Sequence, residues 1–278
     1  MKNTIAAALS LGLAASQTVA TGGERQSPLP GLPAEHGEWN GFKIYHFKLK
    51  GADCRVVTPE KAAAGKPWVW RARFFGHEPQ ADIALLERGF HLVYCDVENL
   101  FGSPKAMKRW DEFHTFATQQ LGLSDKAALE GMSRGGLIAF NWAAANPGKV
   151  SCIYGDAPVC DFKSWPGGKG SGRGARGAWE KCLNAYGFES EAEALAYEGN
   201  PNDRAAALAK ANIPVLIVYG KTDTVVPPTE NCLVFEKAFK AAGGDITLIG
   251  KDDNGHHPHS LEDPAPIVDF VLKHAPAK

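Results

Sequence analysis

The chain has 278 residues and a formal net charge of −1, and 44% of its residues are hydrophobic. A nearly neutral balance gives no general attraction to nucleic acid or to an anionic membrane surface, and basic residues nowhere interleave with aromatic ones, so we expect neither partner. The length fits a single domain built around one sheet.

The first twenty residues have the pattern of a secretory signal peptide. Lys2 precedes an apolar run over residues 5–15, and small residues follow up to Ala20. We therefore expect cleavage after Ala20, a flexible segment over residues 21–40, and a secreted or periplasmic protein. The apolar run is too short to cross a bilayer comfortably, and no later stretch approaches about 18 apolar residues, so no stable membrane insertion is expected.

Strand and helix patterns alternate along the rest of the chain. Short apolar runs rich in β-branched residues predict strands, and longer amphipathic runs predict helices. The expected strands are 42–49, 53–58, 68–74, 91–97, 127–129, 150–154, 213–220 and 246–249, and the expected helices are 79–88, 105–121, 136–145 and 264–274. This alternation indicates a single α/β domain over residues 41–278.

One motif stands between an expected strand and an expected helix. Gly131-Met132-Ser133-Arg134-Gly135 fits the pattern G-x-S-x-G, in which a sharp strand-to-helix turn pushes the serine hydroxyl outward. Glycines two residues before and after the serine leave room for the tight backbone. The alternative is an ordinary glycine turn, because a glycine-rich chain produces this pattern by chance, so the residues downstream decide.

The downstream residues supply an acid and then a base. Asp223 follows the expected strand 213–220, and His256 lies in the loop after the strand 246–249. A serine hydroxyl becomes a good nucleophile when an imidazole accepts its proton, and a carboxylate holds that imidazole in the right tautomer. The order serine, acid, histidine is the one found in this type of sheet protein.

These motifs make the chain resemble the α/β-hydrolase superfamily from about residue 42 to residue 271, and it looks similar to exported esterases of polysaccharide-degrading bacteria. The resemblance implies a mostly parallel, twisted sheet of about eight strands with helices on both faces and a lid insertion. It implies Ser133 as nucleophile, Asp223 as orienting acid and His256 as general base, with no cofactor or metal. It also implies two oxyanion donors, the backbone amide of Arg134 and an amide after the third strand, for which we choose Phe75.

Other residues compete for these roles. His257 and His259 share the loop of His256, and imidazoles bind zinc, yet no nearby cysteine or carboxylate pattern completes a recognisable ligand set. Asp156, after the strand 150–154, is a reserve triad acid. Glu130 lies within the strand before the serine, where a buried carboxylate needs a partner, and we expect it to hold the geometry of the turn.

An insertion over about residues 157–200 occupies the position of a lid. It contains Trp165, Trp179 and several cations (Lys163, Lys169, Arg173 and Arg176). Indole rings stack on sugar rings and cations pair with acids, so we expect Trp165, Trp179 and Arg134 to bind an acidic polysaccharide ester. The alternatives are that the tryptophans pack the lid down, that its cations are solvated, and that Arg134 forms a salt bridge.

Six cysteines lie after the predicted leader, and export permits disulfides. Six cysteines allow 15 pairings, among which Cys160 with Cys182 is our first choice. Cys95 and Cys152 lie on expected buried strands and are interpreted as core thiols.

The sequence thus predicts a secreted serine hydrolase that cleaves carboxylic esters through an acyl-enzyme, with a polysaccharide or sugar ester as substrate. A serine peptidase acting on short peptides is the alternative enzyme. A non-catalytic binding protein on a hydrolase scaffold is the alternative of another class. The oligomeric state stays open.

Overall fold

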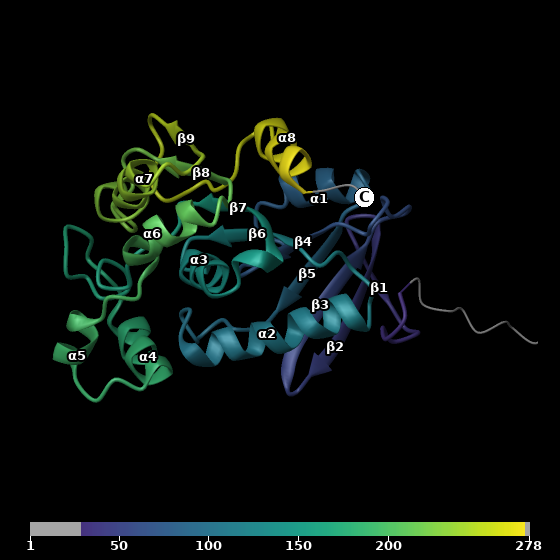
Figure 1. The fold of residues 1–278 in the computed structure, drawn as a ribbon, viewed down its shortest axis with the longest axis horizontal. Helices are drawn as coiled ribbons and strands as arrows, with labels where there is room; N and C mark the ends of the chain where they lie inside the picture. Colours follow the sequence, from purple (N-terminus) through teal and green to yellow (C-terminus); the bar gives the residue numbers. More distant parts are fainter. Residues whose placement is uncertain (1–28, 276–278) are drawn as a thin grey trace, which may run out of the picture.

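A computed structural model describes residues 29–275, and its centre is a single nine-stranded sheet (Figure 1). The strands are β1 (Gly37–Trp39), β2 (Phe42–Leu49), β3 (Ala52–Thr58), β4 (Trp68–Arg71), β5 (His91–Cys95), β6 (Ala127–Met132), β7 (Val150–Asp156), β8 (Val215–Gly220) and β9 (Ile246–Lys251). Their order across the sheet is β1-β2-β3-β5-β4-β6-β7-β8-β9. The strands β1, β2, β3 and β5 pair antiparallel, and the strands from β5 through β4 to β9 run parallel.

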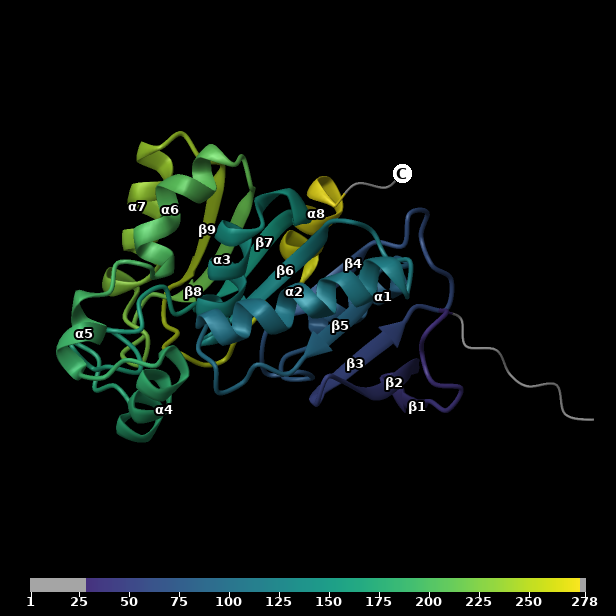
Figure 2. The ribbon, with the colours of Figure 1, turned by 60° about the horizontal axis from the view of Figure 1, so that its bottom comes forward.

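Helices cover both faces of this sheet (Figures 1 and 2). They are α1 (Gln80–Glu87), α2 (Pro104–Gln119), α3 (Gly135–Ala145), α4 (Arg176–Tyr186), α5 (Glu191–Ala196), α6 (Pro201–Lys210), α7 (Cys232–Ala241) and α8 (Ala265–His274). Two short 3₁₀ turns, η1 (Pro147–Lys149) and η2 (Pro228–Glu230), complete the described elements. The predicted α/β-hydrolase architecture is confirmed, with the short β1 as an additional antiparallel strand.

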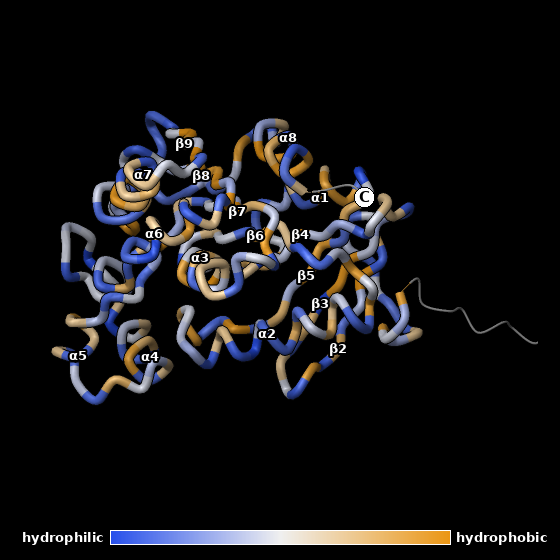
Figure 3. The backbone as a smooth tube through the Cα atoms, in the orientation of Figure 1, coloured by the Kyte–Doolittle hydropathy of each residue, from blue (hydrophilic) through white to orange (hydrophobic). Residues whose placement is uncertain are grey.

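The burial of each strand follows from its place in the sheet. All residues of β6 and β7 are buried, because parallel strands in the middle of such a sheet have helices on both faces. The edge-side strand β2 instead mixes buried and exposed positions. The central helix α3 is apolar along most of its length (Figure 3) and is buried between the sheet and its neighbours.

Two apolar layers hold the helices against the sheet. On one face, side chains of α2, α3, α6 and α7 pack with the inner positions of the strands. On the other face, α1 and α8 pack together over β4 and β5. Each large apolar side chain that is fully buried contributes roughly 1.5–3 kcal/mol to folding, so both layers stabilise the packing of the helices on the sheet.

Aromatic stacking anchors the helix that follows the candidate nucleophile. The Trp70 ring of β4 stacks on Trp110 of α2 with centroids 3.9 Å apart, and Trp142 of α3 meets Trp70 edge-on at 5.0 Å. Such pairs add about 0.5–1.5 kcal/mol each beyond their buried area. They pack α2, α3 and β4 together behind the serine turn.

The segment before β1 is ordered further back than the sequence predicts. Leu29 and Leu32 are only 2% and 8% exposed and belong to the main apolar layer, and β1 pairs with β2. The expectation of a flexible segment up to residue 40 is therefore wrong from residue 29 onward, because these leucines bury apolar surface. The predicted signal peptide and residues 21–28 lie outside the described residues.

The chain between β7 and α6 leaves the sheet and forms a small unit of its own. Its helices α4 and α5 lie next to each other beyond the sheet in both ribbon views (Figures 1 and 2). Phe162, Trp179, Cys182 and Ala194 form its apolar centre together with Phe101. Over residues 29–275, none of the helices combines the length and the apolar character that crossing a membrane requires.

Candidate active site

The turn between β6 and α3 holds Ser133 in a strained conformation. Its φ angle is +48°, a region that costs a residue with a side chain of order 1–3 kcal/mol. Three backbone hydrogen bonds hold this conformation: Ser133 donates its N–H to Asp156 (2.8 Å), and its carbonyl accepts from Gly136 and Val159 (2.9 Å each). These bonds hold the predicted turn, which lies between β6 and α3, against the end of β7 and the loop that follows it.

Two glycines let the backbone of this turn pack tightly. A Cβ on Gly131 would lie 3.1 Å from the Ala139 Cβ, and one on Gly136 would lie 2.7 Å from the Pro158 Cβ and 2.8 Å from the Val159 carbonyl oxygen. The tighter of the two positions is therefore Gly136, which the G-x-S-x-G pattern does not include. The signal for the need of a glycine at this position is that Gly136 lies at the start of a helix that packs on another loop.

Ser133, His256 and Asp223 form one hydrogen-bonded chain. The Ser133 Oγ lies 3.0 Å from His256 Nε2, and His256 Nδ1 lies 2.7 Å from Asp223 Oδ2. The other carboxylate oxygen, Oδ1, accepts the backbone N–H groups of Val225 and Val226 at 2.8 and 2.9 Å. Asp223 is only 5% exposed. Because the two backbone N–H groups occupy Oδ1, Oδ2 is the oxygen that binds and orients the imidazole.

The two loops that carry the acid and the base are fastened to each other. The backbone N–H of Thr222 donates to the Asn254 carbonyl at 3.1 Å, and a Cβ on Gly220 would overlap the carbonyl oxygens of Asn254 and Gly255. The parallel pairing of β8 with β9 brings both loops to the same end of the sheet. His256 thereby reaches Asp223 across 33 residues of sequence.

Asp156 has a different partner from the one expected of a reserve acid. Its Oδ1 accepts from His259 Nδ1 at 2.8 Å, and its Oδ2 accepts from the Tyr154 hydroxyl and the Ser260 N–H at 2.5 Å each. Burial acts to raise the pKa of this carboxyl, but the hydrogen bonds from His259, Tyr154 and Ser260 hold it below its ordinary value. The structure therefore excludes Asp156 as the partner of His256 in this arrangement.

A buried ion cluster lies beneath the turn. Arg71, at the end of β4, contacts the carboxylates of Asp82 and of Glu130, the latter at 3.2 Å. Burial raises the pKa of Glu130 well above its ordinary value despite the attraction of Arg71, and the raised pKa favours the neutral acid. Arg71 also donates to the backbone carbonyl of His77 and so holds the loop after β4. An arginine directly after the apolar run 68–70 is the sequence signal for such a cluster.

A cavity of about 410 Å³ opens beside Ser133. It is lined by Phe74, Phe75, His77, Ser133, His256, His257 and His259. Within the described part of the chain, no hydrogen bond uses the backbone N–H of Phe75 or of Arg134, the two amides expected to bind an oxyanion. Arg134 stands at the N-terminal end of α3, where the helix dipole favours negative charge.

Two arginines share one carboxylate near this cavity. Arg73 pairs with Glu98, and Arg134 approaches the same carboxylate at 3.4 Å. The guanidinium groups of both lie against the Phe74 ring, at 4.7 and 5.7 Å from its centroid. Burial, and then repulsion from Arg73, lowers the pKa of Arg134. The two guanidinium groups and the single Glu98 carboxylate together carry a net positive charge. The contact with Glu98 is the salt bridge of Arg134 that was the alternative to substrate contact.

The lid tryptophans do not line the cavity beside Ser133. Trp179 is 7% exposed, packs against Phe162, and donates its indole N–H to Glu191 at 3.0 Å. Trp165 packs against Phe101 with ring centroids 6.4 Å apart. Several lid cations are also paired: Lys163 donates to a backbone carbonyl, while Lys169 and Arg176 bind glutamates. The expectation that Trp179 stacks on substrate is corrected, because the small lid unit needs this ring for its own core.

The six cysteines are all free and buried. Cys160 belongs to the main apolar layer and Cys182 to the centre of the α4–α5 unit, so the predicted bridge between them is not formed. Burial raises the pKa of Cys152 to about 12, as expected for a core thiol. Cys54 and Cys95 face each other across the antiparallel pair β3 and β5.

Comparison with known proteins agrees with this geometry. Residues 110–276, more than half of the chain, match the model of the prolyl oligopeptidase family of peptidases. The chain belongs to the prolyl oligopeptidase family. Membership confirms the predicted α/β-hydrolase superfamily and makes the protein a serine hydrolase of that class.

Solved structures with the same fold include two peptidases and a hydrolase. This chain is similar to acylaminoacyl peptidase from Pyrococcus horikoshii (TM-score 0.62, 14% identity, covering 84% of this chain and 42% of that chain). It is also similar to dipeptidyl peptidase 4 from Porphyromonas gingivalis (0.63, 13%, 85% and 36%). A third is S-formylglutathione hydrolase from Agrobacterium tumefaciens (0.59, 17%, 86% and 95%). The chain thus spans less than half the length of the two peptidases.

Proposed function

We propose that this serine hydrolase cleaves carboxylic esters through an acyl-enzyme, and that its substrate is a sugar or polysaccharide ester with an acid group. The observation that carries the proposal is the hydrogen-bonded chain from Ser133 through His256 to Asp223, which ends at an open cavity. In this proposal Ser133 is the nucleophile, His256 the general base and Asp223 the orienting acid.

The geometry supports a two-step reaction. The Ser133 Oγ attacks the ester carbonyl while His256 Nε2 takes its proton, and Asp223 stabilises the imidazolium through Nδ1. His256 then gives the proton to the departing alkoxide, which leaves an acyl group on Ser133. A water molecule, deprotonated by the same imidazole, attacks this acyl group and restores the serine. The amides of Arg134 and Phe75 are our candidates for the oxyanion site, where one donor is worth about 3–4 kcal/mol.

Charge around the cavity favours an acidic substrate over a free peptide amine. The side chains that line the cavity include no carboxylate, and the nearby carboxylate of Glu98 is already shared by Arg73 and Arg134. A peptide amino terminus is a cation and needs an acidic partner, whereas the surplus positive charge of the arginine pair attracts a substrate carboxylate. Peptidase activity is the second candidate, favoured by the family match, and a peptide with a blocked amino terminus needs no such acidic partner.

The test is release of methanol, acetate or ferulate from pectin, xylan and aryl esters, with blocked and free aminoacyl arylamides in the same panel. The wild type and Ser133→Ala are compared, and serine-dependent release from an acidic carbohydrate ester supports the proposal. Arg73→Gln should lower kcat/KM for the acidic ester by about 10-fold and leave kcat/KM for a neutral aryl ester unchanged. Only the acidic ester has a carboxylate that pairs with the positive charge of the arginines. Hydrolysis of arylamides alone would establish the peptidase, and silence on the whole panel would favour a binding protein.

We also propose that the protein is exported, on the basis of the leader pattern in residues 1–20. Mass spectrometry of the protein recovered from the periplasm or medium should find Thr21 at its amino terminus. Recovery of the intact chain from the cytosol would contradict export.

A further inference from the structure

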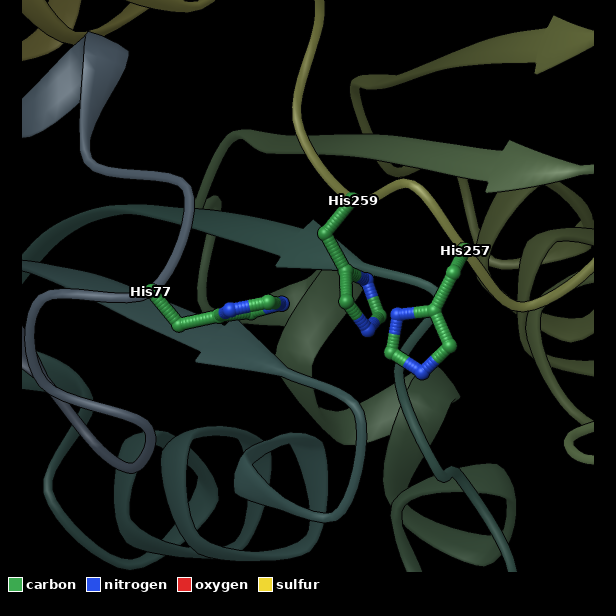
Figure 4. Close-up of side chains that lie close together, drawn as sticks. All are labelled: His77, His257 and His259. Atoms are coloured by element: carbon green, nitrogen blue, oxygen red, sulfur yellow. The ribbon is translucent and has the colours of Figure 1, made fainter.

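Three histidines meet on the wall of the cavity, beside the catalytic group but outside it. His77 follows β4, while His257 and His259 follow β9, so the folding of the sheet brings together imidazoles from distant parts of the chain. One ring nitrogen from each lies within 4.8 Å of the others, and Figure 4 shows His77 and His257 on either side of His259. We propose that His77, His257 and His259 bind a divalent transition-metal ion of the zinc class.

The central ligand is already held as metal-binding histidines are held. His259 is 5% exposed, and its Nδ1 lies 2.8 Å from the Asp156 carboxylate, so the ring offers Nε2 to an ion. Histidine ligands commonly donate their other nitrogen to a carboxylate, which fixes the tautomer and increases ligand basicity. The Tyr154 hydroxyl and the Ser260 N–H hold Asp156 in turn. The proposed Ser133 mechanism does not involve these contacts. In the proposed ion site they orient the His259 ring toward the ion.

The two outer ligands are free to move. Neither imidazole of His77 and His257 makes a hydrogen bond to a described residue, and both residues are exposed. Nitrogen ligands of a tetrahedral zinc ion lie about 3.4 Å apart, as follows from bond lengths of about 2.0–2.1 Å. The ring nitrogens must therefore move closer to one another by up to about 1.4 Å to bind an ion, which exposed side chains without hydrogen bonds do easily. The His77 backbone meanwhile stays fixed by the buried Arg71.

The type of ion follows from the ligands. Three neutral imidazoles suit Zn²⁺, Co²⁺, Ni²⁺ and Cu²⁺, while Mg²⁺ and Ca²⁺ prefer oxygen ligands. Three protein ligands leave a fourth position open, and it faces the cavity that Ser133 also lines. An oxygen atom of water or of a bound substrate can occupy that position.

The neighbouring His256 is a poor ligand in comparison. Its Nδ1 contacts Asp223 and its Nε2 contacts Ser133, so both nitrogens are engaged. The ion site and the hydrolytic group are therefore separable by mutation, and the site does not depend on which bond the enzyme cleaves.

Metal-free full-length protein titrated with Zn²⁺ in a calorimeter, and with Co²⁺ in a visible-absorption experiment, tests the site. We expect one ion per chain, intense visible bands typical of tetrahedral cobalt, and no binding of Mg²⁺. His77→Ala and His257→Ala should each weaken binding at least 10-fold, and the matched control His46→Ala, which removes an exposed histidine on β2, should not. Absence of one-to-one binding in the wild type, or wild-type affinity in both site variants, would overturn the proposal.

A second variant separates the proposed site from the triad histidine. His256→Ala should retain the ion with less than about a 3-fold change in Kd, because His256 is not among the three ligands. Loss of binding in His256→Ala together with unchanged binding in His77→Ala would assign the ion to His256 and refute the site. Each readout is a binding measurement, so a failed substrate panel does not affect its outcome.

Discussion

Replacing Asp223 by asparagine should reverse the hydrogen bonding of His256 without changing the shape of the site. Asp223 Oδ1 accepts two backbone N–H groups, from Val225 and Val226, and only an oxygen can keep both. The asparagine oxygen must therefore stay there, and its NH₂ group must face His256 Nδ1. That nitrogen then has to accept a hydrogen bond rather than donate one, which places the ring proton on Nε2, toward Ser133.

The magnitude follows from the alternatives open to the variant. Turning the amide over would leave the buried N–H of Val226 and the half-buried N–H of Val225 unpaired, at a cost of about 1–3 kcal/mol for a buried donor, so the unfavourable tautomer persists. A ring that carries its proton on Nε2 cannot accept the serine proton, and such a carboxylate-to-amide change lowers kcat by about 10⁴-fold, or roughly 5.5 kcal/mol. Asp156 cannot restore activity, because His259, Tyr154 and Ser260 occupy its carboxylate.

The measurement is kcat/KM on an activated aryl ester for wild type, Asp223→Asn and the control Asp53→Asn, with urea unfolding of each. The control changes an exposed aspartate of β3 whose ion-pair partner is Lys48, so its kcat/KM should match that of the wild type. A folded Asp223→Asn enzyme within 10-fold of wild type would refute the tautomer argument.

Three further outcomes are expected. Gly220→Ala should lower kcat/KM by about 10²-fold, since its Cβ would push Gly255 and thus His256 by roughly 1 Å. The control Gly148→Ala, which has nothing near the new Cβ, should leave kcat/KM unchanged. Equal activities of the two variants would contradict the close approach at Gly220. Burial lowers the pKa of His91 to about 4 from an ordinary 6.5, so the unfolded chain binds the proton first as pH falls. Stability present above pH 6.5 should therefore decline by up to about 3 kcal/mol between pH 6.5 and pH 4, and urea unfolding of His91→Gln should show a smaller decline; an unchanged decline would exclude His91 as its source. A thiol reagent should label none of the six buried cysteines in the native protein and all six in denaturant without reductant, whereas four labels would reveal a disulfide.

Local features of the sequence predicted eight of the nine described strands, four of the eight described α-helices (α1, α2, α3 and α8) and the order of the site residues. The helix expected over residues 136–145 differs by one residue from α3, and the strand expected over 42–49 coincides with β2, because periodicity and glycine punctuation act over a few residues. Ser133, Asp223 and His256 each follow a strand of the parallel part of the sheet, whose carboxyl ends lie at one edge. Their meeting is therefore implied once the strands are recognised.

Only the tertiary structure decided which side chains pair. Arg71 meets Glu130 because β4 lies beside β6, and His77 reaches His259 because its loop opens at the same edge of the sheet. Asp156 binds His259 rather than His256, and Trp179 is buried in its own lid, for reasons that involve segments tens of residues apart. Strand order and the packing of insertions depend on the whole set of long-range contacts, which no local pattern of residues encodes.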